Sequence, residues 1–130
     1  MKNLYIDYNT GGFLTPSISL NASKGECDIR GESSTYNAKE FYRPVLNWVR
    51  AYIQEINQPL HFRFCLTYLD TPSTEIIITL LNLLKTYENN GGQIKITWYY
   101  AREFVGIAEP MEDFIGSLNL TIQFVPFVLI

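Results

Sequence analysis

The most informative stretch of the chain is residues 60–84, where an apolar run passes directly into a helical pattern. One face of the predicted strand carries large apolar residues: Leu60, Phe62, Phe64, Leu66 and Tyr68. Bulky residues also occur among the alternates. A run of this kind is typical of a strand buried on both faces. An apolar stripe at helical spacing then follows: Ile76, Ile77, Leu80, Leu81, Leu84 and Tyr87. We therefore expect a central strand that leads at once into a helix.

The polar residues at this junction predict the start of the helix. Thr71 is expected to be the N-cap, because its hydroxyl can accept a hydrogen bond from a free amide of the first turn. Pro72 would then occupy the first helical position, where its missing N–H is not needed. Ser73 and Thr74 follow within the first turn. The result is a cluster of hydroxyls at the positive end of a helix, and this cluster is our candidate functional centre.

An earlier helix is predicted between about residues 38 and 57 by a second apolar stripe: Phe41, Val45, Trp48, Val49, Tyr52, Ile53 and Ile56. Asn37 and Glu40 match a capping box, with Asn in place of Ser or Thr. Pro44 lies inside the stripe and removes one intrahelical hydrogen bond. We expect a kink or a frayed first turn there.

Strand patterns account for most of the remaining chain. They cover residues 4–8, 14–20, 26–31, 93–100 and 118–128, and a weaker helical pattern covers 102–116. The predicted order is β-β-β-α-β-α-β-α-β, an α/β class. We expect a single domain over residues 1–130 with a mixed sheet: an N-terminal antiparallel hairpin, then parallel strands joined by right-handed crossovers. The helices should lie mainly on one face.

Composition and charge narrow the class of partner. With 130 residues, of which 47% are hydrophobic, the chain is long enough for one buried core. The net charge is −3 and the sequence has no basic run, which argues against nucleic acid. No signal peptide or membrane-spanning segment is recognisable, so we expect a cytoplasmic protein without a membrane partner. Cys27 and Cys65 are expected to be reduced thiols.

Candidate catalytic chemistry is sparse. His61 is the only histidine, and one histidine with two separated cysteines does not make a usual zinc site. No glycine-rich loop has the spacing that cradles phosphates, and a late acidic cluster is explained by a solvated helix face: Glu109, Glu112 and Asp113. We therefore expect neither an enzyme nor a bound cofactor or metal.

The element order and the hydroxyl cluster resemble the STAS fold of anti-sigma-factor antagonists. A more detailed resemblance is to the SiaC family, small bacterial regulators of biofilm formation and cell aggregation. The matching motifs are Thr15-Pro16, Gly31-Glu32-Ser33 followed by Asn37-Ala38, Phe41-Tyr42-x-Pro44-x-Leu46-x-Trp48, Tyr68-Leu69-Asp70-Thr71-Pro72-Ser73 and Trp98-Tyr99-Tyr100. Five motifs in the same order, spread over most of the chain, are fairly specific.

The resemblance implies a switch protein. Members of the family are phosphorylated on the threonine of an Asn-Thr-Ser-Ser motif by a dedicated protein kinase, and a PPM-type phosphatase reverses the modification. The unphosphorylated form binds and activates a diguanylate cyclase, which raises cyclic di-GMP. By motif position the phosphoacceptor here is Thr71, although Asp70 and Pro72 replace the usual Asn and first Ser. The expected partner-binding residues are Asp70, Pro72, Ser73, Thr74, Ser33 and Asn37.

Two other functions remain open on the sequence alone. A STAS-type antagonist would bind an anti-sigma factor with a histidine-kinase-like ATPase fold. A small enzyme with an unrecognised site is the second alternative. The identity of the co-purifying partner distinguishes the first from a cyclase regulator. Activity that survives Thr71→Ala but is lost when a cleft carboxylate is changed would favour the second.

Overall fold

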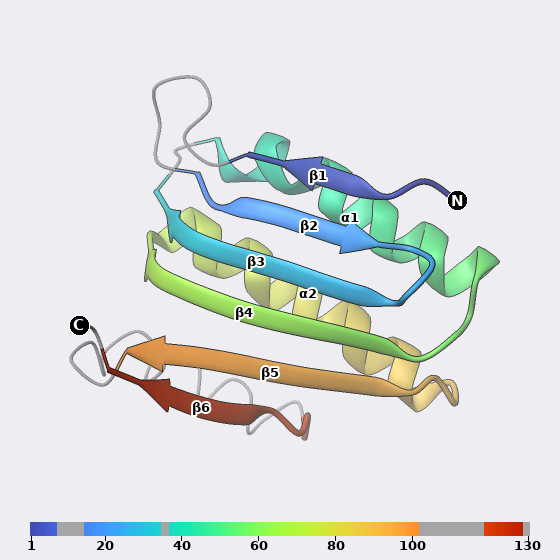
Figure 1. The fold of residues 1–130 in the computed structure, drawn as a ribbon. Helices are drawn as coiled ribbons and strands as arrows, with labels where there is room; N and C mark the ends of the chain where they lie inside the picture. The colour runs from blue at the N-terminus through green and yellow to red at the C-terminus, as the bar shows by residue number, and fades with distance from the viewer. Residues whose placement is uncertain (8–14, 35–36, 102–118, 129–130) are drawn as a thin grey trace.

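The computed structural model describes residues 1–7, 15–34, 37–101 and 119–128, which form six strands and two helices (Figure 1). The strands are β1 (Leu4–Ile6), β2 (Ser17–Asn21), β3 (Glu26–Ser33), β4 (Leu60–Leu69), β5 (Ile94–Ala101) and β6 (Gln123–Phe127). The helices are α1 (Ala38–Glu55) and α2 (Thr71–Asn89). All six strands belong to one sheet, in which their spatial order is the same as their order along the chain.

The strand directions confirm the predicted mixed sheet. β1, β2 and β3 pair antiparallel, whereas β3, β4, β5 and β6 are parallel. The parallel pairs require crossovers, and α1 and α2 supply the first two of them. Both helices lie on the same side of the sheet (Figure 1), as predicted.

The core lies between this side of the sheet and the two helices. The inward residues of β4 are fully buried: Leu60, Phe62, Phe64 and Leu66. The helices contribute one stripe each, with Val45, Val49 and Tyr52 from α1 and Ile77, Leu80, Leu81 and Leu84 from α2. Phe64 stacks on Trp98 of β5 with ring centroids 4.8 Å apart. The apolar stripes predicted for the two helices are therefore the surfaces that pack against the sheet.

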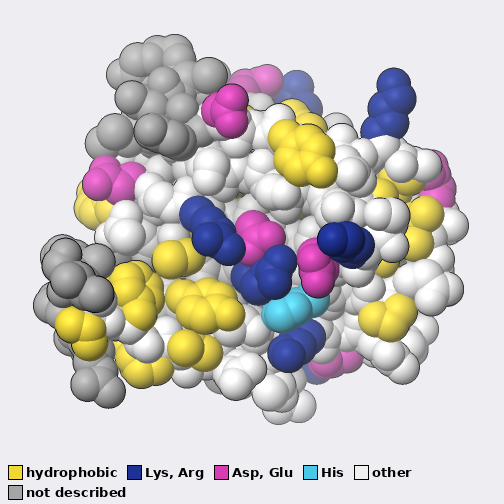
Figure 2. Space-filling view, viewed as in Figure 1, with side chains coloured by type: hydrophobic (Ala, Val, Ile, Leu, Met, Phe, Trp, Pro, Cys, Tyr) yellow, Lys and Arg dark blue, Asp and Glu magenta, His cyan; other side chains and the backbone are white. Residues whose placement is uncertain are grey.

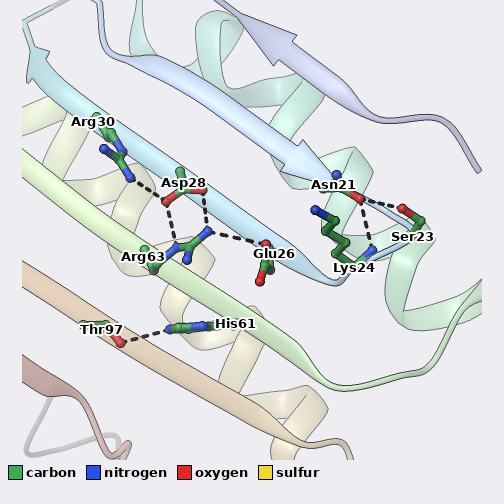
Figure 3. Close-up of polar contacts among 9 residues, drawn as sticks. All are labelled: Asn21, Ser23, Lys24, Glu26, Asp28, Arg30, His61, Arg63 and Thr97. Carbon is green, nitrogen blue, oxygen red and sulfur yellow. Dashed lines mark hydrogen bonds and ion pairs between the residues drawn. The ribbon is translucent and has the colours of Figure 1, made fainter.

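The opposite face of the sheet is open, so the prediction that β4 is buried on both sides is wrong. His61, Arg63 and Cys65 alternate with the core residues and are half-buried, and Thr67 is exposed. Charged side chains gather over the middle of this face (Figure 2). Arg63 binds Asp28 of β3 through Nε at 2.9 Å and Nη2 at 3.0 Å (Figure 3). Hydrogen-bonded charges of this kind keep the middle of the open face polar.

A β-bulge near the end of β4 changes which side chains face the core. Gly31 pairs with Leu66, but Glu32 pairs with Tyr68, so β4 contains one extra residue. Beyond the bulge, Tyr68 is 49% exposed and Leu69 packs against the core. The predicted placement of Tyr68 on the same face as Phe62 and Phe64 is therefore wrong. An extra residue shifts the side-chain alternation by one, and the sequence gives no sign of it.

The capping box expected at the start of α1 and the frayed first turn expected at Pro44 are not found. The Asn37 side chain makes no capping hydrogen bond, and Glu40 pairs instead with Arg43. The helix runs from Ala38 to Glu55 through Pro44, and its first turn is formed. Only one amide donor is lost at a proline, and the buried stripe on either side of Pro44 holds the helix together.

Several predicted boundaries fall at the edge of the described structure. The helix predicted over 102–116 lies outside the described residues, and so does the end of the strand predicted over 4–8. The last strand begins at Gln123, five residues later than predicted. Both cysteines are free: Cys27 is buried in β3, where burial raises the pKa of its thiol, and Cys65 lies on the open face.

Candidate functional site

The start of α2 is capped by Asp70, not by Thr71 as predicted. Asp70 has extended backbone geometry, and its Oδ1 accepts the Ser73 N–H at 2.9 Å. Its carbonyl oxygen accepts the Thr74 N–H and the Thr74 hydroxyl, both at 2.9 Å. A carboxylate at this position satisfies a free amide and also faces the positive end of the helix dipole. Thr71 is therefore the first helical residue and Pro72 the second.

Three hydroxyl-bearing residues follow Asp70 closely, and they differ in availability. Thr71 is exposed, and its hydroxyl has no hydrogen-bond partner among the described residues. Ser73 is 0% exposed. Thr74 is half-buried, and its hydroxyl is used by the Asp70 carbonyl. Thr71 is thus the hydroxyl of this segment that another protein can reach without disturbing the fold.

A chain of buried hydroxyls lies directly beneath Thr71. Ser33, at the end of β3, donates from Oγ to Ser73 Oγ at 2.7 Å, and it lies 2.7 Å from the Tyr42 hydroxyl of α1. Because a serine hydroxyl has one proton to donate, Ser33 accepts from Tyr42. Burial raises the pKa of Tyr42 to about 12, so this phenol is protonated and can donate. The chain therefore connects α1, β3 and the first turn of α2.

The predicted partner-binding residues divide into two groups. Asn37 and Pro72 are exposed, and Asp70 and Thr74 are half-buried. Ser33 and Ser73 are both 0% exposed, so their side chains do not form part of the surface. Their assignment as contact residues is corrected: they support the segment from below. Ser33 could have been recognised as inward-facing, since it continues the alternation of Cys27 and Ile29 along β3.

Replacement of the cap tests its contribution to stability. Asp70→Ala should lower the free energy of unfolding by about 1 kcal/mol, because the Ser73 amide loses its acceptor. Asp70→Asn is the matched control: its amide oxygen still caps the helix without the charge, and the loss should be smaller. Urea denaturation followed by circular dichroism measures both. Equal losses in the two variants would contradict capping as the main role of this side chain.

Other classes of site find little support in the described part of the chain. No group of three or more His, Cys, Asp or Glu residues is arranged to hold a metal ion among the residues placed in the structure. His61 lies on the open face, where its Nε2 is 3.0 Å from the Thr97 hydroxyl (Figure 3). Within the same residues, neither helix is both long and apolar enough to cross a bilayer.

A family model and a solved structure that match this chain carry the same family name. The family model described as SiaC family regulatory phosphoprotein matches residues 10–127. An uncharacterised protein of Pseudomonas aeruginosa (strain UCBPP-PA14) is 29% identical over 114 residues, 88% of each chain. The crystal structure of apo-SiaC from Pseudomonas aeruginosa is similar, with a TM-score of 0.82, 27% identity and coverage of 97% of this chain and 98% of that one.

A second similar structure contains a partner. It is the complex of the diguanylate cyclase SiaD with its activator SiaC from Pseudomonas aeruginosa. The matched chain has a TM-score of 0.85 and 26% identity, and the match covers 95% of this chain and 99% of that one. The resemblance inferred from the five sequence motifs is thereby confirmed over nearly the full length. The chain belongs to the SiaC family of regulatory phosphoproteins.

Proposed function

We propose that this protein is a non-catalytic switch controlled by phosphorylation of Thr71. In the unphosphorylated state it binds and activates a diguanylate cyclase in the cytoplasm, and so regulates biofilm formation or aggregation. A protein kinase adds the phosphate and a PPM-type phosphatase removes it. The observation that carries the proposal is the exposed hydroxyl of Thr71 at the start of α2, which bonds to none of the described residues, in a chain of a phosphoprotein family.

The surrounding hydrogen bonds support Thr71 over its neighbours as the acceptor. A kinase must bring the acceptor oxygen into its own active site, so the hydroxyl has to be accessible. Ser73 would have to leave a buried contact with Ser33. Thr74 would have to give up its bond to the Asp70 carbonyl. Thr71 loses nothing, since its hydroxyl bonds to no described residue.

The first turn of α2 offers few hydrogen-bond donors to a phosphate on Thr71. It adds about −1.5 to −2 charges and three acceptor oxygens. The adjacent Pro72 has no N–H, and the Ser73 N–H is already bound by Asp70. The Asp70 carboxylate repels the added charge, whereas the helix dipole favours it. These opposing effects leave the fold of α2 intact, so the modification acts on whatever docks over Thr71.

The expected effect of the phosphate on the free energy of partner binding is large enough for a switch. Reversing an equilibrium from 1:99 to 99:1 takes about 5.5 kcal/mol of differential binding. Burying a phosphate dianion in an interface without a cationic partner costs several kcal/mol. One phosphate on an exposed residue at the centre of an interface therefore supplies much of the required difference.

The proposed partner follows from the family and from one relative. SiaC of Pseudomonas aeruginosa is the activator of the diguanylate cyclase SiaD. This chain has the same fold, and we extend that class of partner to it. Asp70 and Pro72 flank the acceptor and differ from the usual family motif, so they should influence which kinase and which cyclase recognise this protein.

A pull-down from the native cells tests the proposal. Wild type, Thr71→Ala and Thr71→Asp are used as baits, and captured proteins and phosphopeptides are identified by mass spectrometry. We expect a diguanylate cyclase on the wild-type and Thr71→Ala baits, its loss on Thr71→Asp, and phosphate on Thr71 in the wild type. Identical partners on all three baits, without phosphate on residues 70–74, would show the switch to be wrong. Capture of a histidine-kinase-like ATPase would favour an anti-sigma-factor antagonist instead.

A further inference from the structure

The residues on the two sides of Thr71 and Pro72 are held by a single residue of β3. The Ser33 carbonyl accepts the Asp70 N–H at 3.0 Å. The Ser33 hydroxyl donates to Ser73 Oγ at 2.7 Å. Thr71 and Pro72 lie between these two anchored residues and are both exposed. The exposed dipeptide is therefore fixed at both ends from beneath.

Ser33 is itself fixed by the packing around it. It is 0% exposed, and its Oγ lies 2.7 Å from the hydroxyl of Tyr42, which is 1% exposed. A buried hydroxyl left without a partner costs free energy, so the three hydroxyls stabilise one another's positions. Since Tyr42 belongs to α1, the anchor joins the start of α2 to two other elements of the fold.

We propose that Ser33 is the positioning residue of the switch: it holds the start of α2 so that Thr71 alone is presented and the surface around it keeps one shape. This inference rests on the proposed role of Thr71. A segment that is already ordered loses less conformational entropy when a kinase or a cyclase binds it. The same contact keeps the Ser73 hydroxyl inside, where it does not compete as an acceptor.

Amide hydrogen exchange of the unphosphorylated protein tests the anchor directly. The amides of Asp70, Ser73 and Thr74 are hydrogen-bonded to Ser33 or Asp70 and should exchange slowly in the wild type. Ser73→Ala removes one hydroxyl at a helical position that alanine favours, so the variant should fold. We expect exchange of these three amides to become about tenfold faster, as for the loss of one buried hydrogen bond of average strength.

Control variants separate the anchor from a general loss of stability. The amides of Phe62 and Phe64 in β4 should be unaffected, whereas a purely structural role would accelerate their exchange in proportion. Ser73→Cys, whose thiol fills the same space and still accepts weakly, should restore part of the protection. Thr71→Ala should leave all of these amides unchanged. Ser33→Ala removes the other hydroxyl of the same hydrogen bond and should reproduce the effect of Ser73→Ala.

If exchange at residues 70–74 in Ser73→Ala and Ser33→Ala equals that of the wild type, Ser33 does not position this segment. Uniform acceleration throughout the sheet would also reject the proposal. The measurement needs neither kinase nor cyclase, so it can succeed even if Thr71 carries no phosphate in cells. A failure of the anchor and a failure of the switch are thus distinguishable.

Discussion

Replacing Phe64 by alanine should lower the free energy of unfolding by about 3–5 kcal/mol. Phe64 lies in the middle of β4, is 0% exposed, and stacks on Trp98 at 4.8 Å and beside Phe62 at 5.7 Å. The smaller side chain leaves a cavity that the paired strands on both sides cannot close. Urea denaturation monitored by circular dichroism measures the change.

The same strand provides a control for this prediction. Tyr68 is also aromatic but lies beyond the bulge and is 49% exposed. Tyr68→Ala should change stability by less than about 1 kcal/mol, since little buried contact is lost. A cost for Tyr68→Ala equal to that for Phe64→Ala would mean that the bulge is misplaced and that Tyr68 faces the core.

Replacing Gly25 by alanine should cost about 3 kcal/mol, the second-largest effect on stability. Gly25 has φ +66° in the turn between β2 and β3, and a Cβ there would lie 2.3 Å from the Pro59 carbonyl oxygen and 2.7 Å from the Tyr52 hydroxyl. Part of the cost is the left-handed backbone of a residue with a side chain. The rest arises because the backbone at Pro59 must move away.

Gly91 separates these two contributions. Its φ is +95°, but nothing lies within 4 Å of a Cβ built on it. Gly91→Ala therefore carries the backbone strain without the clash, and we expect a loss of about 1–2 kcal/mol. Chemical denaturation of both variants gives the difference. Equal losses would contradict the close approach of the β2–β3 turn to Pro59.

The strand directions and the position of the core were predictable from the sequence. The stripes of α1 and α2 are unambiguous, and strands alternating with helices leave few alternatives to parallel pairing. The outer face of β4 was misinterpreted because bulky residues such as His61 and Arg63 suggest a fully buried face, whereas both are only half-buried. Arg63 is a surface residue that lies against the sheet and pairs with Asp28.

The start of α2 was predicted to within one residue, and the reason for the error is physical. Asp and Thr are both good N-caps, so local propensity does not choose between Asp70 and Thr71. The choice is made by pairing with β3, where the Asp70 amide binds the Ser33 carbonyl. A local sequence pattern does not indicate contacts between residues as far apart in the chain as Ser33 and Asp70.

The buried hydroxyl chain at the candidate site was also not predictable from local sequence patterns. Ser33 and Ser73 are 40 positions apart in the sequence, and no local pattern indicates that their side chains meet. Their contact exists because the bulge in β4 brings Leu69 opposite Ser33 and starts α2 directly above it. Thr71, by contrast, lies in the first turn of α2 and is exposed.

In the proposed switch, charge on Thr71 decides whether a diguanylate cyclase binds. The most direct measurement compares protein carrying phosphothreonine at position 71, incorporated during translation, with unmodified protein. Isothermal titration calorimetry with the cyclase captured in the pull-down gives both dissociation constants. We expect the phosphorylated form to bind at least about tenfold more weakly, a difference of about 1.4 kcal/mol or more, with the same circular dichroism spectrum. Equal affinities of the two forms would show that a phosphate on Thr71 does not control binding of the cyclase.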